Sequence, residues 1–216
     1  MAEPGPSAAD VELLALVLNW RRAELTLQCL HDLLQQRGVR LGVVVIDNGS
    51  GADELATLQR AVAAARADGH TVELLPLPDN LGFAGGMNAG LALAHRRGVP
   101  FVLVANNDLL LPPDSLLPLL DVLRHDGRVA AVGPTVLHVD GTVWAEGGEV
   151  GFAPNALVLR GHRRAPTPTT HGPEAVGFVP GACMLLRTQV VHELGGFDAD
   201  YFMYWEDVDL CRRLQQ

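Results

Sequence analysis

The chain has little cysteine, no paired cysteine motif and no long apolar run. Its three cysteines, Cys29, Cys183 and Cys211, are far apart and odd in number, which argues against a disulfide framework. We expect reduced thiols in the core of a cytoplasmic protein. No apolar stretch approaches the roughly 20 residues of a membrane span. Residues 1–10 lack the basic start and apolar run of a signal peptide and are expected to form a flexible tail.

Positive charge is also scarce. The net charge is -9 at pH 7, which excludes sequence-independent nucleic-acid binding and leaves nucleic acid out of the expected partners. An anionic nucleotide would therefore have to be met locally, by a metal ion or by backbone N–H groups. With 48% hydrophobic and 19% charged residues among 216, the chain can bury the core of one domain.

Apolar runs and helical spacing alternate along the first two thirds of the chain. Strands are predicted at 13–18, 43–46, 71–75, 101–104 and 129–132, and helices at 24–34, 53–67, 85–96 and 114–124. This alternation predicts an α/β fold with a mostly parallel sheet flanked by helices. Ligands bind such sheets at the carboxyl ends of the strands, where Asp47 and Asp108 lie.

The pattern changes after Pro134. A hairpin is predicted from 136–139 and 142–145, followed by a long loop at 160–173 and a strand at 178–186. No linker or repeat interrupts residues 11–216. We therefore expect a single domain, with an alternating half at about 11–134 and a second half of small hairpins and mixed sheet at about 135–216.

The segment 195–213 places five acids among aromatic residues. Glu206 and Asp207 are adjacent, so on a helix their side chains differ in direction by about 100° and only one can point at a reacting centre. An acid walled by aromatics is suited to act as a general base on a hydroxyl. The aromatics Phe202, Tyr204 and Trp205 are either core or a platform for stacking a sugar.

Two further features leave alternatives open. Asp47 precedes an Asn-Gly-Ser turn, so its carboxylate either binds a nucleoside or caps the next helix. The glycines of 82–90 either let the backbone approach an anion at a helix start or pack the helix on the sheet. They lack the GxGxxG spacing and follow the third strand, which excludes a dinucleotide-binding dehydrogenase.

Four segments taken in order resemble a family-2 glycosyltransferase of the GT-A fold, of the rhamnosyltransferase-like kind. They are 18–20, 47–50, 80–90 together with 106–108, and 195–213, and the resemblance covers about residues 13–216. It implies that the half at about 11–134 binds the nucleotide and that the half at about 135–216 binds the acceptor. It also implies catalytic roles for Asp207 as general base and Glu206 toward the acceptor, and a metal-binding role for Asp108. The donor-binding residues that it implies are Asn19, Trp20, Asp47, Asn80, Gly85, Gly86, Asn88 and Asn106.

The resemblance also implies an activity. It is the inverting transfer of a sugar, rhamnose by analogy, from a dTDP- or UDP-linked donor to a hydroxyl of a bacterial surface glycan or lipid-linked acceptor. Mg²⁺ or Mn²⁺ is the implied cofactor, and because only Asp108 stands at the metal motif, we expect the ion to bind together with the diphosphate. The implied location is cytoplasmic, with peripheral association at the inner face of the membrane and a homodimer left open.

The chain stops at Gln216 inside the helix predicted from Glu206. Members of the family continue with another strand and a histidine-bearing loop. The expectation is therefore a domain shortened at its C-terminus, which binds donor but transfers poorly and exposes an apolar edge that favours self-association.

Two rival functions remain open on the sequence alone. A sugar nucleotidyltransferase would need a basic glycine-rich loop in the first third, where only Trp20-Arg21-Arg22 is found. A module that binds a nucleotide sugar or glycan without turnover would have no need of the Glu206-Asp207 pair.

Overall fold

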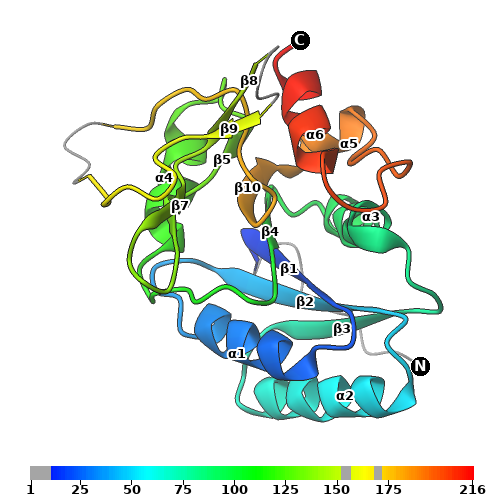
Figure 1. The fold of residues 1–216 in the computed structure, drawn as a ribbon. Coiled ribbons are helices and arrows are strands. Elements are labelled where there is room, and N and C mark those ends of the chain that lie inside the picture. Colours follow the sequence, from blue (N-terminus) through cyan, green and yellow to red (C-terminus); the bar gives the residue numbers. More distant parts are fainter. Residues whose placement is uncertain (1–10, 152–156, 168–171) are drawn as a thin grey trace.

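The computed structural model describes residues 11–151, 157–167 and 172–216 (Figure 1). At its centre is a six-stranded sheet with the order β3-β2-β1-β4-β10-β5. The first four strands in chain order are parallel, and β10 is antiparallel to both β4 and β5. The strands are β1 (Leu13–Asn19), β2 (Leu41–Asn48), β3 (Val72–Leu77), β4 (Phe101–Ala105), β5 (Ala131–Val132) and β10 (Cys183–Arg187). The predicted α/β fold with a mostly parallel sheet is confirmed.

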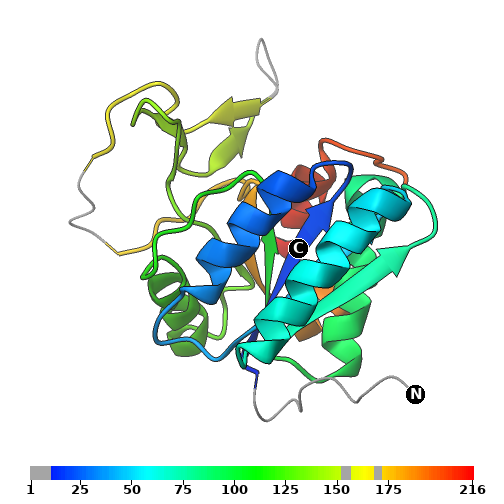
Figure 2. The ribbon, with the colours of Figure 1, turned by 90° about the horizontal axis from the view of Figure 1, so that it is seen from below.

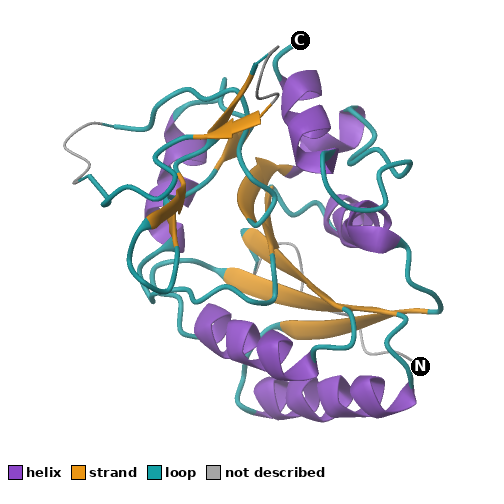
Figure 3. Cartoon of the chain, in the orientation of Figure 1, coloured by secondary structure: helices purple, strands orange, loops and turns teal. Residues whose placement is uncertain are grey.

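Helices cover both faces of the sheet (Figures 1 and 3). One face packs against α1 (Ala23–Leu34), α2 (Ala52–Ala67) and α4 (Leu116–His125), and the other against α3 (Gly82–Arg96), α5 (Thr188–Glu193) and α6 (Glu206–Leu214). The molecule therefore has three layers and two apolar cores, one on each side of the sheet.

The sequence of β1 explains why both faces are covered. Leu13, Ala15 and Val17 belong to the core beneath α1 and α2, whereas Leu14 and Leu16 belong to the core beneath α3. Successive side chains of a strand point to opposite faces, so a strand buried on both faces reads as an unbroken apolar run.

The order of the strands reverses direction between β1 and β4. The chain runs outward from β1 through α1, β2 and α2 to β3, then crosses by α3 to β4 on the other side of β1. Figure 2 shows α1 and α2 next to each other over one face of the sheet. A reversal of this kind parts the loops at the carboxyl ends of the two central strands, which is where α/β proteins bind ligands.

Two small antiparallel hairpins lie outside the main sheet. The first, β6 (Val136–Leu137) with β7 (Val143–Ala145), confirms the predicted hairpin in shortened form. The second, β8 (Gly148–Val150) with β9 (Leu157–Leu159), was not predicted. The expected flexible tail at 1–10, and residues 168–171 of the expected long loop, are outside the described residues. None of the described helices is long and apolar enough to cross a bilayer.

Several boundaries differ from the sequence prediction. The strand expected at 178–186 begins only at Cys183, because Phe178 instead forms an isolated bridge with Gly148. The strand expected at 129–132 is limited to β5. Helix α3 begins at Gly82 rather than Gly85, and α5 had no expected counterpart.

Candidate active site

The two adjacent acids occupy the first turn of α6. The residues just before them, Tyr204 and Trp205, both have a φ of 74°, a left-handed conformation that costs a non-glycine residue on the order of 1–3 kcal/mol. Helix α6 begins directly after this strained turn, and Glu206 and Asp207 are the first two residues of the helix. The carboxylates also lie at the helix N-terminus, where the helix dipole favours negative charge.

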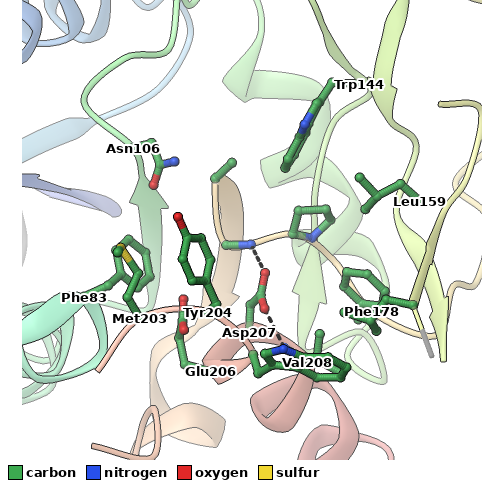
Figure 4. Close-up of a pocket in the computed structure, with 15 residues that line it drawn as sticks. Phe83, Asn106, Trp144, Leu159, Phe178, Met203, Tyr204, Glu206, Asp207 and Val208 are labelled. Carbon is green, nitrogen blue, oxygen red and sulfur yellow. Dashed lines mark hydrogen bonds between the residues drawn. The ribbon is translucent and has the colours of Figure 1, made fainter. Parts of the chain in front are cut away.

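Backbone N–H groups fix the Asp207 carboxylate. Its Oδ2 accepts a hydrogen bond from the N–H of Gly181 at 2.7 Å, and its Oδ1 accepts one from the N–H of Val208 at 2.8 Å (Figure 4). A Cβ at Gly181 would lie 3.3 Å from the Cβ of Asp207, so a side chain there would press on the acid. Each carboxylate oxygen keeps a second lone pair that can accept from a ligand hydroxyl.

Glu206 lies in a different environment. It is 6% exposed, and its Oε2 has no hydrogen-bond partner among the described residues. Burial raises the pKa of the Glu206 carboxyl above its ordinary value, and the neighbouring charge of Asp207 adds to the effect. Two adjacent carboxyl groups with such different surroundings are suited to different chemical roles.

Both acids face a cavity of about 660 Å³. Asn106, which follows β4, lines the cavity across from them (Figure 4). The walls are mostly apolar and come from four parts of the chain: α3, the hairpins, the segment before β10, and the segment before α6. They include Phe83, Trp144, Leu157, Leu159, Phe178, Met203, Tyr204 and Trp205. A few polar groups in an apolar cavity of this size are typical of small-molecule sites.

The carboxyl ends of β1 and β2 bring a second set of predicted residues together. Asn19 and Asp47 are 0% and 2% exposed, and the Asn19 amide donates to Asp47 Oδ1 at 3.1 Å and to Ser50 Oγ at 3.0 Å. The alternative that Asp47 caps the next helix is wrong, because α2 is preceded by Gly51 and has no side-chain cap. Trp20 is 48% exposed at the same edge, with the Arg21 guanidinium 5.4 Å from the centre of its ring.

The N–H groups at the start of α3 are already bonded within the protein. Leu81 donates to Asn48 Oδ1 at 3.0 Å, Gly82 to Asn80 Oδ1 at 2.9 Å, and Phe83 to the carbonyl of Phe202 at 2.8 Å. The expectation that this helix start offers N–H groups to an anion is therefore wrong for these three.

The glycines of α3 pack closely against other parts of the protein. A Cβ at Gly86 would lie 2.4 Å from Leu18 Cδ1 in β1, and one at Gly90 would lie 2.8 Å from Ile46 Cδ1 in β2. A Cβ at Gly85 would instead meet Leu81 Cβ at the start of the same helix, 2.8 Å away. The contacts of Gly86 and Gly90 favour the alternative in which the glycines allow the helix to approach the sheet. The assignment of Gly85 and Gly86 to donor binding stays a prediction.

Asn88 joins α3 to the segment before the acids. Its Nδ2 donates to the carbonyl of Phe197 at 2.7 Å, and its Oδ1 accepts from the Phe197 N–H at 2.9 Å. With the bond from Phe83 to Phe202, this makes α3 the support on which the segment 197–205 rests. Asn88 therefore has a structural role, and its predicted contact with donor is untested.

The residues around Asp108 fit a shared rather than a preformed metal site. Asp108 is exposed just beyond β4 and follows the amides of Asn106 and Asn107. No cluster of three or more His, Cys, Asp or Glu residues that could hold an ion occurs in the described part of the chain. Mg²⁺ and Mn²⁺ prefer hard oxygen ligands. One carboxylate can anchor such an ion when a diphosphate supplies further oxygens.

Sequence reasoning missed three contributors to this region. Gly181 orients Asp207 from 26 positions away, and Trp144 reaches the cavity from a hairpin. Thr26 bonds both Asn19 and Asn107. Only the Pro180-Gly181 turn before an apolar run carried a local signal, since the other contacts depend on the folded chain.

The three cysteines are buried and free. Burial raises the pKa of Cys29 and Cys183 to about 12 and that of Cys211 to about 11. The prediction of core thiols is confirmed, and thiols this hard to ionise are poor nucleophiles at neutral pH.

Comparison with solved structures places the fold among the GT-A glycosyltransferases. A mannosyltransferase from Pyrobaculum calidifontis, solved with GDP-Man and Mn²⁺, superposes with a TM-score of 0.65 at 17% identity, covering 97% of this chain and 54% of that one. TarS of S. aureus, solved with UDP, gives 0.63 at 15% identity over 94% of this chain and 55% of its own.

The sequence comparison defines the family. Residues 15–195 match Glycosyl transferase family 2, and the chain belongs to that family. The N-acetylglucosaminyl-diphospho-decaprenol L-rhamnosyltransferase of Mycobacterium tuberculosis is 33% identical over 198 residues. The match covers 81% of this chain and 61% of the mycobacterial protein, so the chain spans less than two thirds of that relative's length.

Proposed function

We propose that this chain transfers a sugar from a nucleoside-diphosphate donor to an acceptor hydroxyl, with inversion at the anomeric carbon. The observation that carries the proposal is the arrangement of the cavity. Glu206 and Asp207 line it together with Asn106 from the carboxyl end of β4. In a family-2 chain, this puts a pair of acids beside the strand ends where α/β sheets bind nucleotides.

Asp207 is the proposed general base. Its carboxylate accepts the proton of the acceptor hydroxyl while that oxygen attacks the anomeric carbon from the side opposite the leaving nucleoside diphosphate. The new glycosidic bond forms as the bond to the diphosphate breaks, so one displacement inverts the configuration. The hydrogen bonds from Gly181 and Val208 hold the base in one orientation through this step.

Glu206 is proposed to bind the acceptor. Glu206 lines the cavity, and its buried Oε2 has no hydrogen-bond partner among the described residues, so a sugar hydroxyl that reached this oxygen would satisfy it. The apolar walls, Trp144 and Tyr204 among them, would stack on the sugar rings and exclude water.

The donor is proposed to bind along the ends of β1, β2 and β4. Asp47 would contact the nucleoside, with Trp20 and Asn80 beside it, and Asn106 would contact the donor sugar. Asn19, which is fully buried, would contribute to donor binding through its hydrogen bond to Asp47. Asp108 would hold Mg²⁺ or Mn²⁺ together with the diphosphate, and the ion would neutralise charge on the leaving group. Gly85, Gly86 and Asn88 remain predicted donor contacts.

The relative's name suggests the substrates. A mycobacterial rhamnosyltransferase that acts on a diphospho-decaprenol-linked sugar supports rhamnose as the transferred sugar and a lipid-linked acceptor. The dTDP or UDP carrier of the donor stays a prediction. A cytoplasmic location, association with the inner face of the membrane and a homodimer stay predictions.

A nucleotide panel tests the donor assignment. Thermal shift with UDP, dTDP and GDP in Mn²⁺ should show stabilisation by the pyrimidine nucleotides, which EDTA weakens. Asp108→Ala should reduce the Mn²⁺-dependent part of the shift more than Asn106→Ala does. Stabilisation by GDP alone would contradict the pyrimidine donor, and an undiminished Mn²⁺ effect in Asp108→Ala would assign the ion to other ligands.

A further inference from the structure

Thr26 lies between the two halves of the proposed donor site. It is 0% exposed on α1, and its hydroxyl donates to Asn19 Oδ1 at 2.7 Å. The same oxygen accepts a hydrogen bond from the amide of Asn107 at 2.9 Å. A single buried hydroxyl therefore bonds the end of β1 and the loop that follows β4.

A second side chain of α1 holds the same loop. Cys29, one helical turn beyond Thr26, has its Sγ 3.5 Å from the carbonyl oxygen of Asn106. On the other side, the N–H of Asn106 donates to the carbonyl of Ala182 at 2.9 Å. The segment leading to Asp108 is thus fixed from α1 and from the segment before β10.

These bonds connect the carboxyl end of β1 with the loop that follows β4. On the β1 side, the Asn19 amide donates a hydrogen bond to the Asp47 carboxylate at 3.1 Å. On the β4 side, Asn107 immediately precedes Asp108. A chain of hydrogen bonds therefore runs from Asp47 through Asn19 and Thr26 to Asn107, and Asp108 is the next residue along the backbone.

We propose that Thr26 is a positioning residue for donor binding, whose hydroxyl sets the placement of the Asp47 end of the site relative to the Asp108 end. The inference rests on the proposed function, because it takes those acids as the two donor contacts. A nucleoside diphosphate engages both ends at once, so its affinity depends on the distance between them in a way that general stability does not.

Three substitutions isolate the hydroxyl. Thr26→Val removes it while keeping a branched side chain, and Thr26→Ser keeps it. Thr57→Val is the control for the same change on another helix, because the Thr57 hydroxyl on α2 donates to the carbonyl of Asp53 and accepts from Arg60, neither of which belongs to the proposed donor site. A further variant, Asn107→Ala, removes the amide that donates to the Thr26 hydroxyl, and Asn107 is only half-buried.

Isothermal titration with UDP and dTDP in Mn²⁺ is the readout, with the melting temperature measured alongside. Thr26→Val and Asn107→Ala should each raise Kd about tenfold, and the double variant should raise it no further, since both remove one connection. Thr26→Ser and Thr57→Val should stay within about twofold of wild type.

Two results would overturn the inference. If Thr26→Val melts at a lower temperature but binds nucleotide as wild type does, the hydroxyl only stabilises the fold. If Thr26→Val does not fold, wild-type affinity in Asn107→Ala would likewise show that the connection does not position the donor. Wild-type protein that binds neither nucleotide would remove the proposed function, and this inference with it.

Discussion

At the scale of single residues, the two adjacent acids Glu206 and Asp207 have different surroundings. The Asp207 carboxylate is held by two backbone N–H groups, whereas one oxygen of the nearly buried Glu206 has no partner among the described residues. A positioned carboxylate is suited to accept a proton in a fixed direction. An unpaired one gains most from a ligand that donates a hydrogen bond.

Asp207→Asn should lower kcat by about 10²–10⁴, the usual contribution of a general base, while donor affinity stays close to wild type. Steady-state kinetics combined with donor titration checks both quantities. Asp209→Asn, on the same helix but paired with Arg213, is the control and should retain activity. Normal turnover in Asp207→Asn would end its assignment as the base.

Glu206→Gln should change how stability depends on pH. The pKa of Glu206 is raised in the folded protein above its ordinary value of 4.5, so ionising it opposes folding as pH rises through and above that value. The variant should therefore gain stability over wild type with increasing pH, and the gain should vanish below about pH 4. Urea denaturation at pH 4 and pH 8 measures it. A gain at pH 4 that equals the gain at pH 8 would contradict a buried charge at this position.

At the scale of elements, α3 supports the segment that carries the acids. Asn88 bonds both backbone groups of Phe197, and Gly196 leaves no room for a side chain there, since its Cβ would lie 2.5 Å from Asn88 Oδ1. The helix thus connects the sheet to the strained turn before α6.

Asn88→Ala should lower the free energy of unfolding by about 1–3 kcal/mol, because it leaves two backbone groups without their partner. Hydrogen exchange should speed up in the segment 197–205 and not in α1. Gln189→Ala on α5, which removes an exposed bond to Glu193, should cost less than about 0.5 kcal/mol. Unchanged stability together with weaker nucleotide binding would instead assign Asn88 to the donor.

The helices and strands also show which parts of the fold could be predicted from the sequence. β1, β2, β4 and the helices on one face were predictable, because buried parallel strands form continuous apolar runs and helical spacing is local. The start of α3 was not, since its N–H groups bond Asn48 and Phe202, far away in the chain. The pairing of β10 likewise depends on which strand edge remains free after the parallel strands have assembled.

The candidate site also contains some residues that could be predicted from the sequence and others that could not. Asp47 and Asn106 were predictable as strand ends, and Glu206 and Asp207 as an acid pair among aromatics. Gly181 and Thr26 were not, because each acts through a residue 26 or 81 positions distant. Local sequence thus identifies the candidate groups, but the contacts that orient them emerge only from the folded chain.

At the scale of the whole molecule, two regions meet at one edge of the sheet. The ends of β1 and β2 form a polar, buried corner, and the hairpins, the segment before β10 and α6 enclose the apolar cavity beyond β4. Such a division matches a reaction between a charged nucleotide donor and an acceptor that needs a dry pocket. The net charge of -9 makes a bridging cation more favourable for binding a diphosphate.

Sugar transfer itself is the decisive measurement. Wild-type protein and Asp207→Asn are incubated with dTDP-rhamnose, Mn²⁺ and a synthetic N-acetylglucosaminyl-diphospho-polyprenol, and the acceptor is followed by mass spectrometry. The proposal predicts an acceptor heavier by one deoxyhexose with the wild type, an inverted anomeric configuration by NMR, and almost no product with Asp207→Asn. Equal product from both proteins, or a product of retained configuration, would contradict it.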